Sequence, residues 1–141
     1  MKGTYALLKL LSKICCRLSP EAAEKVGRGL GQFFWMCVPP KRKRLAVNNI
    51  LRTGIANNEK DAKRIAKASS LRFGPLGVAM FRFPLLNKEN IRDHVTIIGS
   101  EKLDAIKASG KGCILAATHC GNWEMEGAAL ALYGYPLLSV A

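Results

Sequence analysis

The spacing of apolar and charged positions in the first half of the chain predicts a succession of helices. Between Thr4 and Leu18, the basic residues Lys9, Lys13 and Arg17 recur every four positions, and mostly apolar residues fill the gaps. Side chains four apart share one helix face. The pattern therefore predicts a helix with a basic stripe beside a wide apolar face, which is typical of helices lying in a membrane interface. A helix packed on a protein core with its basic stripe in solvent fits the same pattern.

Capping residues place a second helix directly after the first. Ser19 suits an N-cap and Pro20 the first helical position, so we expect a helix that continues through the aromatic run Phe33–Met36. That run is predicted to belong to the core. Pro39-Pro40 then ends the element.

Two further helices are expected before the pattern changes. Residues 41–52 begin with four basic residues, which oppose the helix dipole at an N-terminus. The next helix is predicted to begin near residue 58 and to run toward Phe73. Gly74-Pro75 is predicted to break it, with a further apolar helical stretch reaching Phe83.

The second half is predicted to alternate strands and helices. The expected order is a strand His94–Ile98, a helix Glu101–Ser109 capped by Ser100, a strand Cys113–Thr118, a helix Gly121–Tyr133 and a strand Pro136–Val140. This order implies parallel pairing with right-handed crossovers. The predicted fold class is therefore α/β, with a helical, membrane-associated region at 1–86 and a parallel βαβαβ region at 87–141. Because the sequence stops within an apolar strand, we expect an incomplete sheet and one truncated domain.

Charge is distributed unevenly along the 141 residues. The formal net charge is +12, and residues 1–72 carry 16 Lys and Arg against 4 Asp and Glu, whereas residues 73–141 carry 6 of each. A basic first half indicates a polyanionic partner, either a nucleic acid or an anionic membrane. Five cysteines without a CxxC spacing argue against a disulfide framework and a zinc site. No uncharged apolar run is long enough to predict a transmembrane helix.

Candidate chemistry gathers where the second predicted strand ends. His119 follows that strand, and Glu124 falls in the first turn of the next helix, where its carboxylate can turn back onto the imidazole. A carboxylate on one ring nitrogen fixes the tautomer and leaves the other nitrogen to accept a proton. The backbone N–H groups near Gly121 and Asn122 are candidates for stabilising an oxyanion. Cys120 is not expected to act as a nucleophile, because adjacent side chains at a strand end point apart.

Each of these residues also has a purely structural interpretation. A first-turn Glu after a helix-capping His is common by chance, and the motif alone is only a hypothesis. Asn122 either lines an acceptor pocket or caps the helix. Trp123 either lines that pocket or packs on the sheet.

The segment Gly112–Glu124, Gly-Cys-Ile-Leu-Ala-Ala-Thr-His-Cys-Gly-Asn-Trp-Glu, resembles the bacterial lipid A biosynthesis acyltransferases of the late, lauroyl/myristoyl type. That family looks like a branch of the lysophospholipid acyltransferases, which are marked by His-x4-Asp/Glu. The basic segment Lys41–Ile50 and the segment Val95–Leu103 also fit the family's order. Family members are longer, and their basic residues after the next strand are missing here.

The resemblance implies a function for each residue of the motif. His119 would deprotonate an acceptor hydroxyl, Glu124 would orient His119, and Cys120, Gly121 and Asn122 would lie at the acceptor. An acyl carrier protein or coenzyme A thioester would be the donor, with no metal and no other cofactor. The acceptor would be a lipid A precursor or a related membrane glycolipid, and an inositol mannoside remains open within the wider family.

The implied location is the cytoplasmic face of the cell's inner membrane, in an interfacial or monotopic position. Basic side chains near an anionic membrane surface contribute about 1 kcal/mol each. The stripe Lys9, Lys13 and Arg17 and the run Lys41–Arg44 would supply such contacts, with no nucleic acid as partner.

Two alternatives stay open at this point. The first is a nucleic-acid-binding module in which Lys41–Arg44 and Lys60–Arg72 contact phosphates, although no known nucleic-acid motif is present. The second is an inactive fragment that only sits on a membrane. A requirement for detergent would separate a membrane protein from a nucleic-acid binder.

Overall fold

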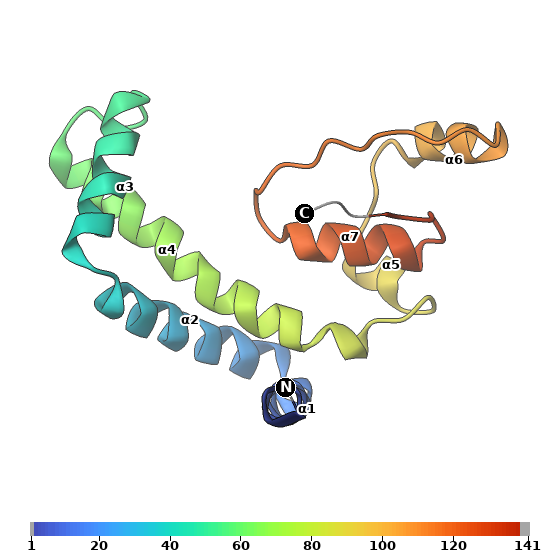
Figure 1. Ribbon diagram of the computed structural model, residues 1–141, viewed down its shortest axis with the longest axis horizontal. Helices are drawn as coiled ribbons and strands as arrows, with labels where there is room; N and C mark the ends of the chain where they lie inside the picture. Colours follow the sequence, from blue (N-terminus) through green and yellow to red (C-terminus); the bar gives the residue numbers. More distant parts are fainter. Residues whose placement is uncertain (1, 139–141) are drawn as a thin grey trace. The chain divides into compact units, whose positions relative to one another are not determined.

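The chain folds into helices and irregular segments that form two compact units, with the boundary between Arg82 and Phe83. The computed structural model describes residues 2–138. Within them the elements are α1 (Lys2–Arg17), α2 (Pro20–Cys37), α3 (Pro40–Arg52), α4 (Glu59–Phe81), the 3-10 helix η1 (Phe83–Leu85), α5 (Ile91–His94), α6 (Ser100–Ala108) and α7 (Trp123–Leu132), as Figure 1 shows.

The first unit confirms the predicted starts of α2 and α4. The Ser19 hydroxyl accepts a hydrogen bond from the Ala22 N–H at 3.2 Å, so Ser19 is the N-cap of α2. Asn58 caps α4 in the same way, with its side-chain oxygen 2.9 Å from the Asp61 nitrogen. Each cap satisfies one of the donors that a helix start leaves unpaired.

The predicted break at Gly74-Pro75 is wrong, because α4 runs through Pro75 without interruption. The reason is tertiary packing against α2, which lies alongside α4 in Figure 1. A Cβ built on Gly27 would lie 2.5 Å from the Pro75 Cα, and a Cβ on Gly74 would overlap the carbonyl oxygen of Gly27. Glycines at these contacts let the two backbones approach closely, and the burial holds the proline within the helix.

The contact also compensates the hydrogen bond that the proline removes. Pro75 has no N–H to donate to the carbonyl of Leu71, four residues earlier. A Cβ built on Gly31 would overlap that carbonyl oxygen, so a Cα–H of Gly31 faces it instead. Weak Cα–H···O contacts of this type are frequent at close helix–helix interfaces.

The core of the first unit lies where α3 and α4 pack together. Buried Val47, Ala56, Ala62 and Ala66 form its centre, and Trp35 packs against them. The other residues of the aromatic run are not core, which corrects the prediction: Phe33 is 64% exposed, Phe34 55% and Met36 67%. The buried residues of α2 are Ala23, Gly27 and Gly31, and Phe33 and Met36 point away from the face that they form.

The second unit has no strand or sheet among its described residues, so the predicted parallel βαβαβ half is wrong. The segments that were predicted as strands have no neighbouring segment to form backbone hydrogen bonds with, and no element covers their side chains. Ile98 is 95% exposed and Ile114 98%, whereas a central strand buries such side chains. An extended segment becomes a strand only when another segment accepts and donates its backbone hydrogen bonds.

Three local features of this unit also differ from the predictions. His94 ends the short helix α5 rather than starting a strand. Gly99, at φ +83°, precedes α6 in place of the predicted Ser100 cap, because this position needs a left-handed backbone. Of the predicted strand Pro136–Val140, residues 136–138 are irregular and residues 139–140 lie outside the described residues.

Side-chain hydrogen bonds tie the end of α7 to the earlier elements of the second unit. The Tyr133 hydroxyl donates to the Val95 carbonyl, and Lys107 Nζ donates to the Gly134 carbonyl at 2.8 Å. The Tyr135 hydroxyl donates to the Asp104 carboxylate at 2.8 Å, which raises the pKa of Tyr135 because the bond stabilises the neutral phenol. Among the described residues of this unit, Ile91, Ala129 and Leu130 are the buried apolar side chains.

Candidate active site

The residues of the His-x4-Glu motif lie at the start of α7. An irregular segment leads to a bend at His119, and Gly121 follows with φ +61°. A positive φ turns the backbone sharply into the helix, which glycine does without strain. The Asn122 side chain then caps α7 by accepting a hydrogen bond from the Met125 N–H at 3.0 Å.

Trp123 lies against both members of the motif. Its ring centroid is 5.0 Å from that of His119, with the planes tilted by 44°. Its indole Nε1 donates a hydrogen bond to the Glu124 Oε1 at 3.1 Å. His119 and Glu124 are exposed and Trp123 is half-buried, so a solvent-accessible imidazole and carboxylate flank one aromatic side chain.

The predicted His119–Glu124 hydrogen bond is not among the interactions of residues 2–138. The Glu124 Oε1 accepts from Trp123, and the exposed side chain leaves Oε2 open to a further donor. Asn122 acts as the helix cap, which is the structural alternative for this residue. The backbone N–H groups of Gly121 and Asn122 have no acceptor within the described part of the chain, as expected before a first helical turn.

Cys120, the other predicted acceptor-site residue, is exposed between His119 and Gly121. Its place at the acceptor stays a prediction. Sequence reasoning did not assign the link between Trp123 and Glu124. The sequence does contain a signal for this link, because an indole N–H donor and a carboxylate acceptor stand at adjacent positions.

A second candidate feature is the exposed apolar side of α1. Ser12 Oγ donates to the Phe81 carbonyl at 2.8 Å, so this side of α1 packs against the end of α4. Leu7, Leu10 and Ile14 fall on the opposite side of the helix and are 56%, 55% and 49% exposed. These three residues are called the α1 apolar face below.

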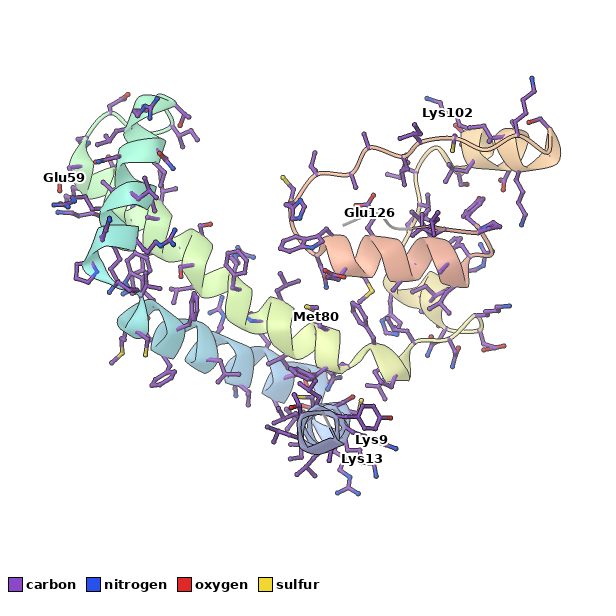
Figure 2. All side chains as sticks on the ribbon, in the orientation of Figure 1. Lys9, Lys13, Glu59, Met80, Lys102 and Glu126 are labelled. Atoms are coloured by element: carbon purple, nitrogen blue, oxygen red, sulfur yellow. The ribbon has the colours of Figure 1, made fainter. Side chains whose placement is uncertain are left out.

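The basic stripe borders this face. Lys9 and Lys13 project from one side of α1 in Figure 2. In the helical register, Lys9, Lys13 and Arg17 fall between the packed side and the α1 apolar face. The helix α1 therefore has three sides. One side packs on the first unit, one side is basic, and the α1 apolar face contacts no other part of that unit.

The exposed side of α2 adds to the apolar surface of the first unit. Val26, Leu30, Phe33 and Met36 are 43%, 52%, 64% and 67% exposed. Soluble proteins rarely gather this many large apolar side chains on neighbouring helices without a partner. None of the helices in residues 2–138 is both long and apolar enough to cross a bilayer.

Metal-ligating residues do not cluster in the described residues. No three side chains of His, Cys, Asp or Glu come together there in a way that would hold an ion. The chemistry that this geometry offers rests on the imidazole, the carboxylate and the backbone amides at the start of α7.

Comparison with known proteins places this chain in a family. The chain is 37% identical over 62 residues to two proteins named phosphatidylinositol mannoside acyltransferase from Mycobacterium tuberculosis, one from strain CDC 1551 / Oshkosh and one from strain ATCC 25618 / H37Rv. The match covers 43% of this chain and 20% of each relative, so the matched segment spans about a fifth of the relatives' length. No solved structure matches the chain. The profile of the bacterial lipid A biosynthesis acyltransferases matches residues 3–141, and the chain belongs to that family.

Proposed function

We propose that the full-length protein transfers a fatty acyl group from a thioester carrier to a hydroxyl of a membrane glycolipid, with His119 as the general base. The observation that carries the proposal is the grouping of His119, Trp123 and Glu124 at the start of α7 in a member of an acyltransferase family. The imidazole is exposed, so an acceptor hydroxyl has access to it.

The reaction needs no group beyond these residues and the two substrates. His119 takes the proton of the acceptor hydroxyl while the oxygen attacks the thioester carbonyl. The N–H groups of Gly121 and Asn122 stabilise the negative charge on the carbonyl oxygen of the tetrahedral intermediate. The intermediate collapses by breaking the carbon–sulfur bond, and the imidazolium returns its proton to the departing thiolate.

Glu124 acts on this reaction through His119. We propose that during the reaction its Oε2 turns to accept the N–H of the imidazole nitrogen that does not face the acceptor, which fixes the tautomer and stabilises the imidazolium. The hydrogen bond from Trp123 holds the other oxygen, Oε1. Cys120 and Asn122 border the acceptor.

The substrates are proposed from the family and the relatives. The donor is the thioester of acyl carrier protein or of coenzyme A. The acceptor is a lipid A precursor or an inositol mannoside glycolipid, supported by the family description and by the relatives' name. In both cases a hydroxyl of a membrane glycolipid receives the acyl group.

We also propose that the first unit places the protein on the cytoplasmic face of the membrane. The α1 apolar face enters the interface, and Lys9, Lys13 and Arg17 meet anionic headgroups. The exposed Phe33 and Leu30 favour a membrane over a nucleic acid as the partner, because nucleic-acid surfaces are polar and highly charged.

The test is acyl transfer by the full-length protein in membranes, with labelled donor and either acceptor. His119→Ala is expected to lower kcat by about 10²–10⁴-fold. Glu124→Ala is expected to lower kcat as well, with less effect on KM.

The chain supplies matched controls for both substitutions. His94→Ala removes the other histidine, and Glu126→Ala removes a second exposed first-turn carboxylate of α7. Both controls are expected to keep normal rates. Near-normal transfer by His119→Ala would show that the motif is structural.

A further inference from the structure

We infer that Asn122 is a positioning residue of the acyl transfer, because its side-chain oxygen caps α7 and thereby holds Trp123 and Glu124 in place. The inference rests on the proposed function, in which Glu124 acts through His119. Asn122 also borders the acceptor in that proposal, so a direct contact between its amide and the substrate is the competing explanation. The two explanations differ in which atom of the amide matters, the oxygen or the nitrogen.

The start of α7 is held by two polar groups of Asn122. The side-chain Oδ1 accepts a hydrogen bond from the Met125 N–H at 3.0 Å. This bond pairs an N–H group that a helix start leaves without a partner. The backbone carbonyl of Asn122 accepts from the Glu126 N–H at 3.2 Å, which is the first backbone bond of the helix. Trp123 and Glu124 are the two residues that follow, so both lie within the turn that these bonds close.

The segment before α7 gives the motif little support of its own. Residues 112–121 are irregular and exposed, and within the described part of the chain their backbones make no hydrogen bond to another backbone group. Gly121, at φ +61°, then turns the chain toward the helix. Helix ends fray unless a cap holds them. The Asn122 cap is therefore the bond that fixes where α7 begins.

The cap bears on catalysis because the side chains of the motif interact within this turn. The Trp123 indole donates to the Glu124 carboxylate at 3.1 Å, and its ring lies 5.0 Å from the His119 ring. The direction of a side chain follows the backbone conformation of its own residue. When the turn frays, the indole and the carboxylate leave these positions together. Asn122 therefore acts on His119 through Trp123 and Glu124.

Substitutions of Asn122 separate a cap from a substrate contact. Asn122→Ala removes both the oxygen and the amide N–H groups. Asn122→Ser and Asn122→Asp keep an oxygen that caps a helix about as well as asparagine does, and neither carries an amide N–H. Serine leaves the net charge unchanged, and an ionised aspartate has no donor at all. A cap is therefore rescued by both residues, whereas a substrate contact through the amide nitrogen is not.

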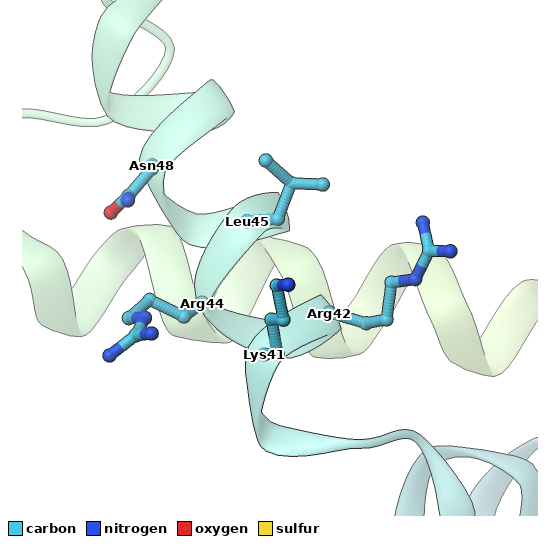
Figure 3. A pocket seen from close by; sticks show the side chains of 5 residues that line it. All are labelled: Lys41, Arg42, Arg44, Leu45 and Asn48. Atoms are coloured by element: carbon cyan, nitrogen blue, oxygen red, sulfur yellow. The ribbon is translucent and has the colours of Figure 1, made fainter.

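The chain offers matched controls for the loss of an asparagine. Asn58→Ala removes a cap of the same chemistry from the other unit, because Asn58 Oδ1 accepts from the Asp61 N–H at 2.9 Å at the start of α4. Asn48→Ala removes an exposed asparagine inside α3, one helical turn from Arg44 in Figure 3. Circular dichroism checks that all variants keep their helices.

The experiment measures acyl transfer by the full-length protein in membranes, with kcat and the acceptor KM determined for each variant. We expect Asn122→Ala to lower kcat by about fivefold with an unchanged KM, as the loss of one cap lets the turn fray. Asn122→Ser and Asn122→Asp should stay within about twofold of the wild-type kcat. Both controls should keep normal rates. Hydrogen exchange of the Met125 amide should be faster in Asn122→Ala and near normal in Asn122→Ser.

The inference is overturned if serine and aspartate lose as much activity as alanine, because the substrate then requires the amide nitrogen. A raised KM with unchanged kcat in Asn122→Ala also overturns it, and so does an equal loss of activity in Asn58→Ala. An active His119→Ala enzyme overturns the proposed function and this inference together. An inactive His119→Ala enzyme, combined with no rescue by serine, overturns this inference alone.

Discussion

The indole Nε1 of Trp123 donates a hydrogen bond to the Glu124 carboxylate, with 3.1 Å between Nε1 and Oε1. The same indole ring lies 5.0 Å from the His119 ring. Trp123 therefore positions both side chains of the motif, one through a hydrogen bond and one through ring contact. In the proposed mechanism it is a positioning residue, because it acts through Glu124 and His119.

Replacing Trp123 by Phe should separate these two contributions. Phenylalanine keeps an aromatic ring beside His119 but cannot donate to Glu124. We expect kcat for acyl transfer to fall by about three- to tenfold with little change in KM, since one hydrogen bond to a charged group is lost at an exposed site. A Trp123→Phe enzyme with unchanged kcat would show that the indole N–H has no part in catalysis.

The α1 apolar face should govern membrane binding. Replacing Leu10 and Ile14 together by Gln is expected to weaken binding to anionic vesicles by at least about tenfold, because each apolar side chain gains about 1.5–3 kcal/mol when fully buried. The measurement is vesicle co-sedimentation. Leu85→Gln, an exposed leucine in η1, is the control and should bind normally. Equal binding by all variants would show that the α1 apolar face does not contact the membrane.

The close contact between α2 and α4 should tolerate no side chain at its glycines. Gly31→Ala is expected to destabilise the protein by about 1–3 kcal/mol, because the new methyl group overlaps the Leu71 carbonyl. Gly29→Ala is the matched control on the same helix, since a Cβ there meets nothing within 4 Å. It should stabilise the protein by about 0.5–1 kcal/mol through helix propensity. Urea unfolding followed by circular dichroism measures both, and equal effects would contradict the contact.

Arg82 should fix the end of α1. Its Nη1 donates to the carbonyls of Cys15 at 2.7 Å and Leu18 at 2.6 Å, at the end of α1, where carbonyls lack the usual N–H four residues on. Arg82→Ala is expected to cost about 1.5–3 kcal/mol and to speed hydrogen exchange in α1. Arg72→Ala, an exposed cation of the same helix α4, should change neither quantity. If hydrogen exchange in α1 is equally fast in both variants, Arg82 does not stabilise the end of α1.

The Tyr135–Asp104 hydrogen bond should give the second unit a dependence on alkaline pH. Because the bond raises the pKa of Tyr135 in the folded state, its contribution is complete below the ordinary tyrosine pKa of about 10. That contribution is lost as the pH rises through the folded pKa. In a spectrophotometric titration of the tyrosines, Asp104→Ala should lower the pKa of Tyr135, and Asp93→Ala should not. A titration curve unaffected by Asp104→Ala would refute this link.

The sequence predicted the helices of the first unit because their signals are local. Ser19 caps α2 through a bond to a residue three positions away, and Pro39-Pro40 separates α2 from α3 by backbone chemistry alone. The same holds for the start of α7, where His119 and Glu124 are close in sequence and so meet one side chain, Trp123, without help from distant elements. Membership of the acyltransferase family also follows from the sequence, through the match over residues 3–141.

Only the tertiary structure decided the features that depend on partners distant in sequence. Pro75 stays inside α4 because Gly27 of α2 packs against it and Gly31 packs against the Leu71 carbonyl, contacts that no local pattern contains. Apolar runs such as Cys113–Thr118 looked like buried strands, yet they remain irregular and exposed among the described residues. Strand formation requires hydrogen bonds to a second segment, whereas helix formation requires only the segment itself, and this difference separates the predictions that held from those that failed.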